Sequence, residues 1–223
     1  MKLRSHEVEN AVLLTLDIPP MNTLGVEEVQ GLRQFLQHHD DQTPLVITGT
    51  GSAFSAGVDT KAFASYTKSQ RTQLFDEITA MTAALMAITA PVVAAVNGHA
   101  MGGGLVLALC ADYRIAAQTE AKFGLTEANA GIAFPAGPAA VISHELSPNL
   151  LRRLTLSSCI VDADLLLREG VFDEVVAIDV LVEMAVQRSR SLAGQPAFAE
   201  VKRQVRGELA ARLAAMASER RQK

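Results

Sequence analysis

The stretch that decides the fold is Asn97-Gly98-His99-Ala100-Met101-Gly102-Gly103-Gly104. An apolar, β-branched run precedes it at residues 92–96, and an apolar segment follows it at residues 105–110. The run predicts a buried strand, and the segment after the glycines predicts the start of a helix. Glycines lack a Cβ, so an anionic oxygen can approach the unpaired N–H groups of a first helical turn. The stretch therefore predicts a corner that can hold developing negative charge, although three glycines alone fit close packing of two helices equally well.

Two further stretches carry groups that would act together with this corner. Residues 45–48 predict a short apolar strand that runs into Gly49-Thr50-Gly51-Ser52-Ala53-Phe54-Ser55-Ala56-Gly57-Val58-Asp59, a loop that offers more backbone N–H groups. Residues 123–137 place one carboxylate, Glu127, among apolar side chains. A carboxylate there can act as a general acid and base. The alternative is that Glu127 only interacts with the dipole at a helix N-terminus.

The three stretches together resemble the crotonase superfamily, also called the enoyl-CoA hydratase/isomerase family. The likeness extends from about Val8 to about Arg203 and is carried by Gly-x-Gly-x-Ala-Phe-Ser-Ala-Gly-Val-Asp (49–59), Ala-Pro-Val-Val-Ala-Ala-Val-Asn-Gly-x-x-x-Gly-Gly-Gly (90–104), Ala-Asp-Tyr-Arg-Ile-Ala (111–116) and Phe-Gly-Leu-Thr-Glu (123–127). The resemblance implies an α/β protein with a crotonase-like (ClpP/crotonase) ββα-superhelix spiral core and C-terminal helices. We expect that core in residues 1–195 and a short C-terminal helical segment in residues 196–223.

The same resemblance implies roles for individual residues. The backbone N–H groups of Val58 and Gly103 would form an oxyanion hole for the thioester oxygen, and Glu127 would be the catalytic carboxylate. The acyl-CoA thioester would contact the family's loop segment and glycine corner, which here are Ala56, Val58, Asp59, Thr60, Lys61 and Gly103. Coenzyme A enters as part of the substrate, so we expect no separate cofactor and no metal site.

One position departs from the pattern of the enoyl-CoA hydratases. Those enzymes carry a second glutamate two residues after the triple glycine, and the two carboxylates together activate water. This sequence has Val106 at that position. A single Glu127 in an apolar pocket, where burial should raise its pKa, suits a shift of the double bond of an enoyl-CoA by proton transfer. The segment Pro19-Pro20-Met21-Asn22-Thr23-Leu24 agrees, because it is similar to the opening of the Δ3,Δ2-enoyl-CoA isomerases.

Two other functions remain open. The first is an enoyl-CoA hydratase or another crotonase reaction, such as dehydration or thioester hydrolysis, which would use Glu127 alone or with a carboxylate from around Asp76-Glu77. The second belongs to a different class, a non-catalytic acyl-CoA-binding subunit. His99 is a minor candidate for a catalytic role, because its position varies in the family.

Length and composition restrict the partners. The chain has 223 residues, of which 49% are hydrophobic and 4% aromatic. Its formal charge of −4 excludes binding of nucleic acid through a general positive surface charge. No stretch reaches the roughly 18 apolar residues of a membrane span, and the N-terminus lacks the apolar region of a signal peptide. We therefore expect a soluble, cytoplasmic protein without nucleic-acid or membrane partners. Cys110 and Cys159 are interpreted as buried thiols. Two basic clusters are interpreted as mostly solvated surface: Lys61, Lys68 and Arg71, and Lys202, Arg203 and Arg206.

The rest of the pattern predicts alternating strands and helices without a sequence repeat, so any structural repetition must be hidden. Further strands are expected at residues 12–17, 113–116, 121–123 and 174–176. Helices are expected from residue 22 to about 36 and at residues 70–88, 138–146, 150–156, 163–169, 180–192 and 196–217. In the family, the C-terminal helices pack on neighbouring subunits, which implies a homotrimer or a hexamer.

Overall fold

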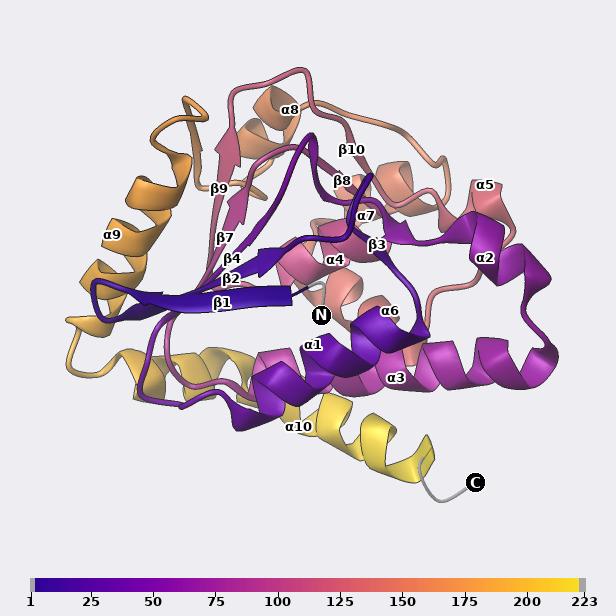
Figure 1. Ribbon diagram of the computed structural model, residues 1–223, viewed down its shortest axis with the longest axis horizontal. Coiled ribbons are helices and arrows are strands. Elements are labelled where there is room, and N and C mark those ends of the chain that lie inside the picture. Colours follow the sequence, from indigo (N-terminus) through magenta and orange to yellow (C-terminus); the bar gives the residue numbers. More distant parts are fainter. Residues whose placement is uncertain (1–2, 221–223) are drawn as a thin grey trace.

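The computed structural model describes residues 3–220 and shows a layered α/β protein (Figure 1). The strands are β1 Leu3–Val8, β2 Ala11–Leu16, β3 Thr23–Leu24, β4 Leu45–Gly49, β5 Ala53–Ser55, β6 Gly57–Val58, β7 Val92–Val96, β8 His99–Met101, β9 Tyr113–Ala117, β10 Phe123–Gly124 and β11 Glu174–Val176. The helices are α1 Val26–His38, α2 Thr60–Ser65, α3 Lys68–Ala87, α4 Gly103–Leu109, α5 Glu127–Ala130, α6 Ala136–Glu145, α7 Pro148–Thr155, α8 Ala163–Arg168, α9 Leu181–Ala193 and α10 Phe198–Arg220.

The largest sheet has six strands in the order β1-β2-β4-β7-β9-β11. Its strands run parallel except for β1, which pairs antiparallel with β2. Alternate residues point to opposite faces, so Val46 and Val93 pack against α9 while Ile47 and Ala94 face the main core. Both faces of the central strands are therefore covered, which explains why residues 45–48 and 92–96 are almost continuously apolar.

The hidden repetition is a pair of strands that recurs along the chain. Each of β4, β7 and β9 in the large sheet is followed by a short strand, β5, β8 or β10, and these three form a second parallel sheet in the order β10-β8-β5. Helices follow each strand pair, which is the ββα spiral of a crotonase-like fold, as predicted. The repetition leaves no sequence period because the same backbone turn can be filled by many combinations of apolar residues.

The C-terminal helix α10 packs against α3 and α6 beneath the spiral (Figure 1). Leu209 and Leu213 of α10 are buried in the same core as the spiral's side chains. The division of the chain at residue 195 stays a prediction, and its outer ends, residues 1–2 and 221–223, lie outside the described residues.

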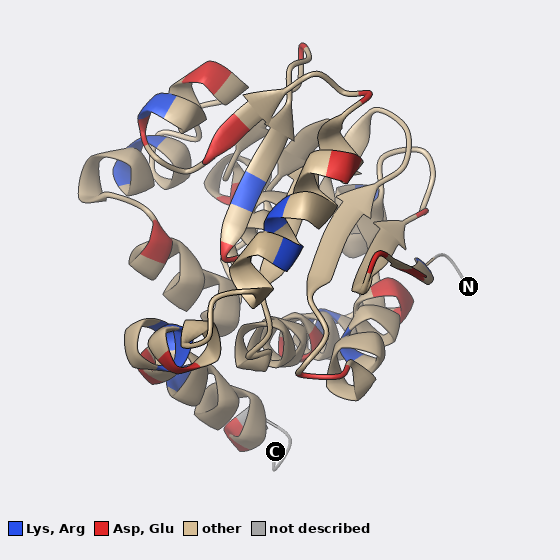
Figure 2. Ribbon diagram, turned by 90° about the vertical axis from the view of Figure 1, so that its left-hand side faces the viewer, with Lys and Arg blue, Asp and Glu red and all other residues tan. Residues whose placement is uncertain are grey.

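The prediction of a solvated surface is wrong for two of the basic residues on α10. Lys202 Nζ lies 2.6 Å from Asp112 Oδ2, and the Lys202 side chain is 8% exposed. Arg206 lies 3.0 Å from Asp112 and 2.6 Å from Glu145, and its side chain is 11% exposed. The two basic residues are four apart, so they share one helical face, and that face meets the core. Figure 2 shows charges of both signs interspersed along the helices and on some strands and loops.

Three further differences from the sequence predictions concern short elements. β1 was not predicted, because its middle residues are polar and exposed and only the pairing with β2 holds them in a sheet. Residues 23–24 form β3 instead of opening a helix, and α1 begins after Gly25, whose N–H donates to Glu28 Oε2 at 3.2 Å. The strand expected at residues 121–123 is β10, shifted to Phe123–Gly124.

Two other expectations concern the cysteines, which were interpreted as buried thiols, and the lack of a membrane-spanning segment. Cys110 is buried, whereas Cys159 is half-buried, and both are free thiols. Burial raises the pKa of Cys110 to about 12, so that thiol is inert at neutral pH. Within residues 3–220, none of the helices is both long and apolar enough to cross a membrane.

Candidate active site

The glycine corner and the loop before α2 meet at their backbones. Gly57 has a φ of +73°, and a Cβ on it would lie 2.6 Å from the carbonyl oxygen of Met101 and 2.8 Å from the nitrogen of Gly103. Only glycine fits such a conformation and such a close approach without strain. Val58 follows Gly57 in β6, so the contact brings Val58 next to the first residue of α4, Gly103. The Gly103 N–H has no partner within its own helix, because it belongs to the first turn.

Each of the three consecutive glycines faces a different neighbour. A Cβ on Gly102, whose φ is +52°, would lie 2.8 Å from Glu127 Oε1. Gly103 lies against the Cα of Gly57, and a Cβ on Gly104 would lie 2.0 Å from the carbonyl oxygen of Ser55. The triple glycine therefore does more than let two helices pack, because it brings the loop of residues 49–59 and the Glu127 carboxylate to one corner.

Glu127 is the first residue of α5, and the residue as a whole is half-buried. Its Oε2 atom is buried and has no hydrogen-bond partner among the described residues. Burial raises the pKa of Glu127 from its usual 4.5 to about 7, and a hydrogen bond from its own backbone N–H lowers the pKa only in part. Glu127 thus stands at a helix N-terminus and also lines the cavity, and its role as a general acid and base stays a prediction.

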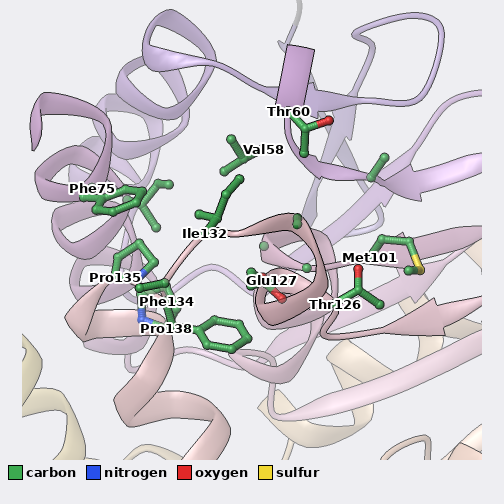
Figure 3. A pocket seen from close by; sticks show the side chains of 16 residues that line it. Val58, Thr60, Phe75, Met101, Thr126, Glu127, Ile132, Phe134, Pro135 and Pro138 are labelled. Atoms are coloured by element: carbon green, nitrogen blue, oxygen red, sulfur yellow. The ribbon is translucent and has the colours of Figure 1, made fainter. Parts of the chain in front are cut away.

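One cavity joins these groups (Figure 3). Phe75 and Pro138 lie on one side of it and Met101 and Thr126 on the other, with Glu127 between them. Of the residues expected at the site, five line this cavity: Ala56, Val58, Thr60, Gly103 and Glu127. Glu127 is the one ionisable side chain among the described residues that line it.

Asp59 and Lys61 lie next to the cavity without lining it. The Asp59 carboxylate accepts hydrogen bonds from the N–H groups of Lys61 and Ala62, both at 3.0 Å, and so caps the N-terminus of α2. Lys61 itself is exposed. The expected contacts of these two residues with coenzyme A stay predictions.

The structure places no second carboxylate from residues 3–220 in the cavity. Val106 is 2% exposed and packs in the main core. Glu77 binds Arg33 at 2.8 Å and Gln30 at 3.1 Å, so it faces α1, and Asp76 does not line the cavity. A carboxylate supplied from around Asp76-Glu77 is therefore not part of this cavity.

His99 contacts a different part of the chain. Its Nδ1 accepts a hydrogen bond from the Lys122 N–H at 2.9 Å, and the residue does not line the cavity. No group of His, Cys, Asp or Glu within the described part of the chain could hold a metal ion.

Sequence reasoning missed part of the apolar lining. The helix expected at residues 70–88 is α3, and it contributes Phe75 and Ile78. Ile132, Phe134 and Pro138, which come soon after Glu127, were given no role. Their signal was weak, because residues 131–135 form an irregular segment with neither helical nor strand periodicity.

The comparisons with known proteins agree on the family that this chain resembles. A model of the family described as enoyl-CoA hydratase/isomerase matches residues 7–222. The chain is 31% identical over 191 residues to a probable enoyl-CoA hydratase, EchA17, of Mycobacterium tuberculosis, which covers 84% of this chain and 72% of the relative. It is 32% identical over 203 residues to a carnitinyl-CoA dehydratase of Salmonella enteritidis, covering 84% and 73%. The solved structure of Pseudomonas aeruginosa DspI superimposes with a TM-score of 0.86 at 32% identity, covering 93% of this chain and 81% of that one.

Proposed function

Because the chain belongs to the enoyl-CoA hydratase/isomerase family of acyl-CoA enzymes, we propose that it shifts the double bond of an enoyl-CoA thioester by proton transfer through Glu127. One observation carries this proposal. The cavity that Val58 and Gly103 line contains one carboxyl group from the described residues, and that group has a pKa near neutrality.

The oxyanion hole is the first part of the mechanism. The thioester oxygen accepts hydrogen bonds from the N–H groups of Val58 and Gly103 and becomes an enolate oxygen as C2 loses its proton. Donors fixed in advance stabilise this charge without having to reorient, and each contributes about 2.7–4 kcal/mol in comparable sites. Neither side chain takes part, so the bulk of Val58 shapes the pocket without affecting its N–H.

Glu127 moves the proton. Its carboxylate takes a proton from C2 of a 3-enoyl thioester, and the C–H electron pair forms a dienolate with the thioester carbonyl. The protonated Glu127 then gives the proton to C4 while the dienolate collapses to the conjugated 2-enoyl thioester. A carboxyl group with a pKa near 7 serves both as base and as acid at neutral pH, because neither form is strongly disfavoured.

Hydration is the main rival, and the names of two relatives favour it, since one is called a hydratase and the other a dehydratase. Water addition in this cavity would have to be supported by Glu127 alone among the described ionisable side chains. We therefore rank hydration, dehydration and thioester hydrolysis below double-bond migration.

A panel of CoA thioesters tests the proposal. The conjugated thioester absorbance should grow when the protein is given a 3-enoyl-CoA and should change slowly when it is given a 2-enoyl-CoA. Rapid loss of the absorbance from the 2-enoyl-CoA would favour hydration instead. Tight binding without turnover of any thioester would favour a non-catalytic binding subunit.

The assembly and location are proposed from the family alone. We propose a homotrimer or a hexamer in the cytoplasm, and the mass in solution tests the first part. No contact between copies enters the mechanism above.

A further inference from the structure

Asn22, in the Pro19–Leu24 motif, is buried against the loop of residues 49–59, which leads to Val58. It is 1% exposed and has a φ of 51°, a conformation that asparagine adopts more easily than most residues. Its Oδ1 accepts from the Ile18 N–H at 2.8 Å, and its Nδ2 donates to the carbonyl oxygens of Ala53 at 2.8 Å and Thr50 at 3.0 Å. The side chain therefore ties the end of β2 to the loop that follows β4.

The Asn22 backbone reaches Val58 through Ser55. Ser55 is 0% exposed, and its Oγ donates to the Asn22 carbonyl at 2.7 Å and accepts from the Gly57 N–H at 3.1 Å. Val58 is the next residue after Gly57. β3, which begins one residue after Asn22, also pairs with β6, with Leu24 opposite Val58. Two connections, one through a side chain and one through a strand pair, thus run from Asn22 to Val58.

A second amide connects the same loop to the glycine corner. Asn97 follows β7, and its Oδ1 accepts from the Gly49 N–H at 2.9 Å. Its Nδ2 contacts the Ala53 carbonyl at 3.3 Å, so Ala53 accepts from both asparagines. The Ser55 carbonyl oxygen also packs against Gly104, because a Cβ on that glycine would lie only 2.0 Å from it. The loop between β4 and β6 is therefore fixed at two places. Ser55 connects it to the residue before Val58, and Asn97 and Gly104 connect it to the corner that carries Gly103.

We propose that Asn22 and Ser55 are positioning residues that set the placement of the Val58 N–H relative to the Gly103 N–H. This inference rests on the proposed function, because it assumes that the two N–H groups hold the thioester oxygen. An oxyanion hole is effective only if its donors are fixed in advance, and small displacements of reacting groups are costly. Loss of the Ser55 hydroxyl removes its hydrogen bond with the Gly57 N–H and its link to the Asn22 carbonyl, so Val58 moves relative to Gly103.

The test compares Ser55→Ala with a matched control, Thr48→Val. Thr48 is also buried, and its hydroxyl donates to a backbone carbonyl, that of Ala95, at 2.8 Å within the large sheet. Both variants lose one buried hydroxyl group, which makes two hydrogen bonds in Ser55 and one in Thr48, but only Ser55→Ala changes the loop that leads to Val58. The measurements are kcat and KM for a 3-enoyl-CoA, the unfolding midpoint, and the infrared carbonyl band of a saturated acyl-CoA labelled with ¹³C at the thioester carbon.

The expected result separates position from stability. Ser55→Ala should lower kcat by about 10- to 100-fold, somewhat less than the loss of an entire donor, with little change in KM. The carbonyl band should move to lower wavenumber on binding the wild-type protein, and in Ser55→Ala it should stay closer to its value in water. Thr48→Val should lose similar stability and keep both kcat and the band. Ser55→Cys, of nearly the same size with a weaker donor, should fall between, and it replaces Ser55→Ala if that variant does not fold.

The outcomes distinguish the two proposals. If the band moves normally in the wild-type protein and also in Ser55→Ala or Ser55→Cys, with unchanged kcat, the positioning role is wrong and the proposed function stands. Equal kcat losses in Thr48→Val and the Ser55 variants would overturn it too. If the wild-type protein does not move the band at all, the oxyanion hole is wrong, and this inference falls with it.

Discussion

Glu127 Oε1 lies so close to Gly102 that a Cβ on the glycine would be only 2.8 Å from it. The glycine corner and the carboxylate are thus built against each other, although they are more than twenty residues apart in sequence. This close approach and the φ of +52° account for the choice of glycine at position 102.

Gly102→Ala should abolish most of the activity, since the added methyl group must displace the Glu127 carboxylate. We expect kcat for a 3-enoyl-CoA to fall by at least about 100-fold, the lower part of the range for losing a general base. Gly170→Ala is the matched control, because Gly170 also has a positive φ, +72°, but has open space around its Cβ position. Gly170→Ala should lose stability and keep its rate. Equal rates in the two variants would contradict the account.

The pH dependence of kcat/KM should follow the ionisation of Glu127. The carboxylate is the base, and burial raises its pKa to about 7, so the active form is lost as pH falls through that value. The rate should drop about tenfold for each pH unit well below 7 and level off above it. Steady-state assays between pH 5 and pH 9 (roughly the range in which the fold should hold) check this. A profile that is flat down to about pH 5 would show that no such carboxyl group governs the reaction.

The same shift predicts that Glu127→Gln stabilises the fold at high pH. Below 4.5 the carboxyl group is protonated in both the folded and the unfolded chain, so its ionisation has no effect on stability. Between 4.5 and about 7 the unfolded chain ionises first, and the folded state loses stability as pH rises. Above about 7 the full cost applies, up to about 3 kcal/mol in the free energy of unfolding. Urea denaturation should therefore show the variant more stable than the wild type at pH 8.5 and nearly equal at pH 4. A less stable variant at pH 8.5 would contradict the burial argument.

The buried ion pairs of α10 should matter more than the exposed ones. Arg206→Met leaves Asp112 with Lys202 and Glu145 with Arg114, so the cost in the free energy of unfolding should lie above about 1 kcal/mol but below the roughly 3–5 kcal/mol of an unpaired buried charge. Arg203→Met is the matched control, because Arg203 lies on the same helix and its ion pair with Glu200 is more than half exposed. That change should cost less than about 1 kcal/mol. Chemical denaturation of both variants distinguishes them, and similar losses would mean that the Arg206 pairs do not hold α10 in place.

The sequence alone predicted those elements whose burial leaves a clear pattern. The strands around Val46 and Val93 were found because both of their faces are covered, and α3 was found from its apolar spacing. β1 was missed because its polar middle residues, such as His6, carry no such pattern. Lys202 looked like surface because its partner Asp112 is 90 residues away in the chain, and pairs of that separation leave no local signal.

The site was predictable in part, and for a different reason. Val58, Gly103 and Glu127 were placed together by the resemblance to a family, and the structure brings them to one cavity. Their roles remain proposals. The Asn22 network could not be foreseen, because its bonds go mostly to backbone atoms, which every residue supplies.

The most direct test of the central claim is the initial rate at which Glu127→Gln forms a 2-enoyl-CoA from a 3-enoyl-CoA. The variant and the wild-type protein are both measured at pH 8, about one unit above the pKa of Glu127. Glutamine keeps the size of the side chain and removes the proton carrier, so the account predicts a loss of roughly 10²- to 10⁴-fold in kcat with acyl-CoA binding retained. A variant that forms the conjugated product at close to the wild-type rate would contradict it.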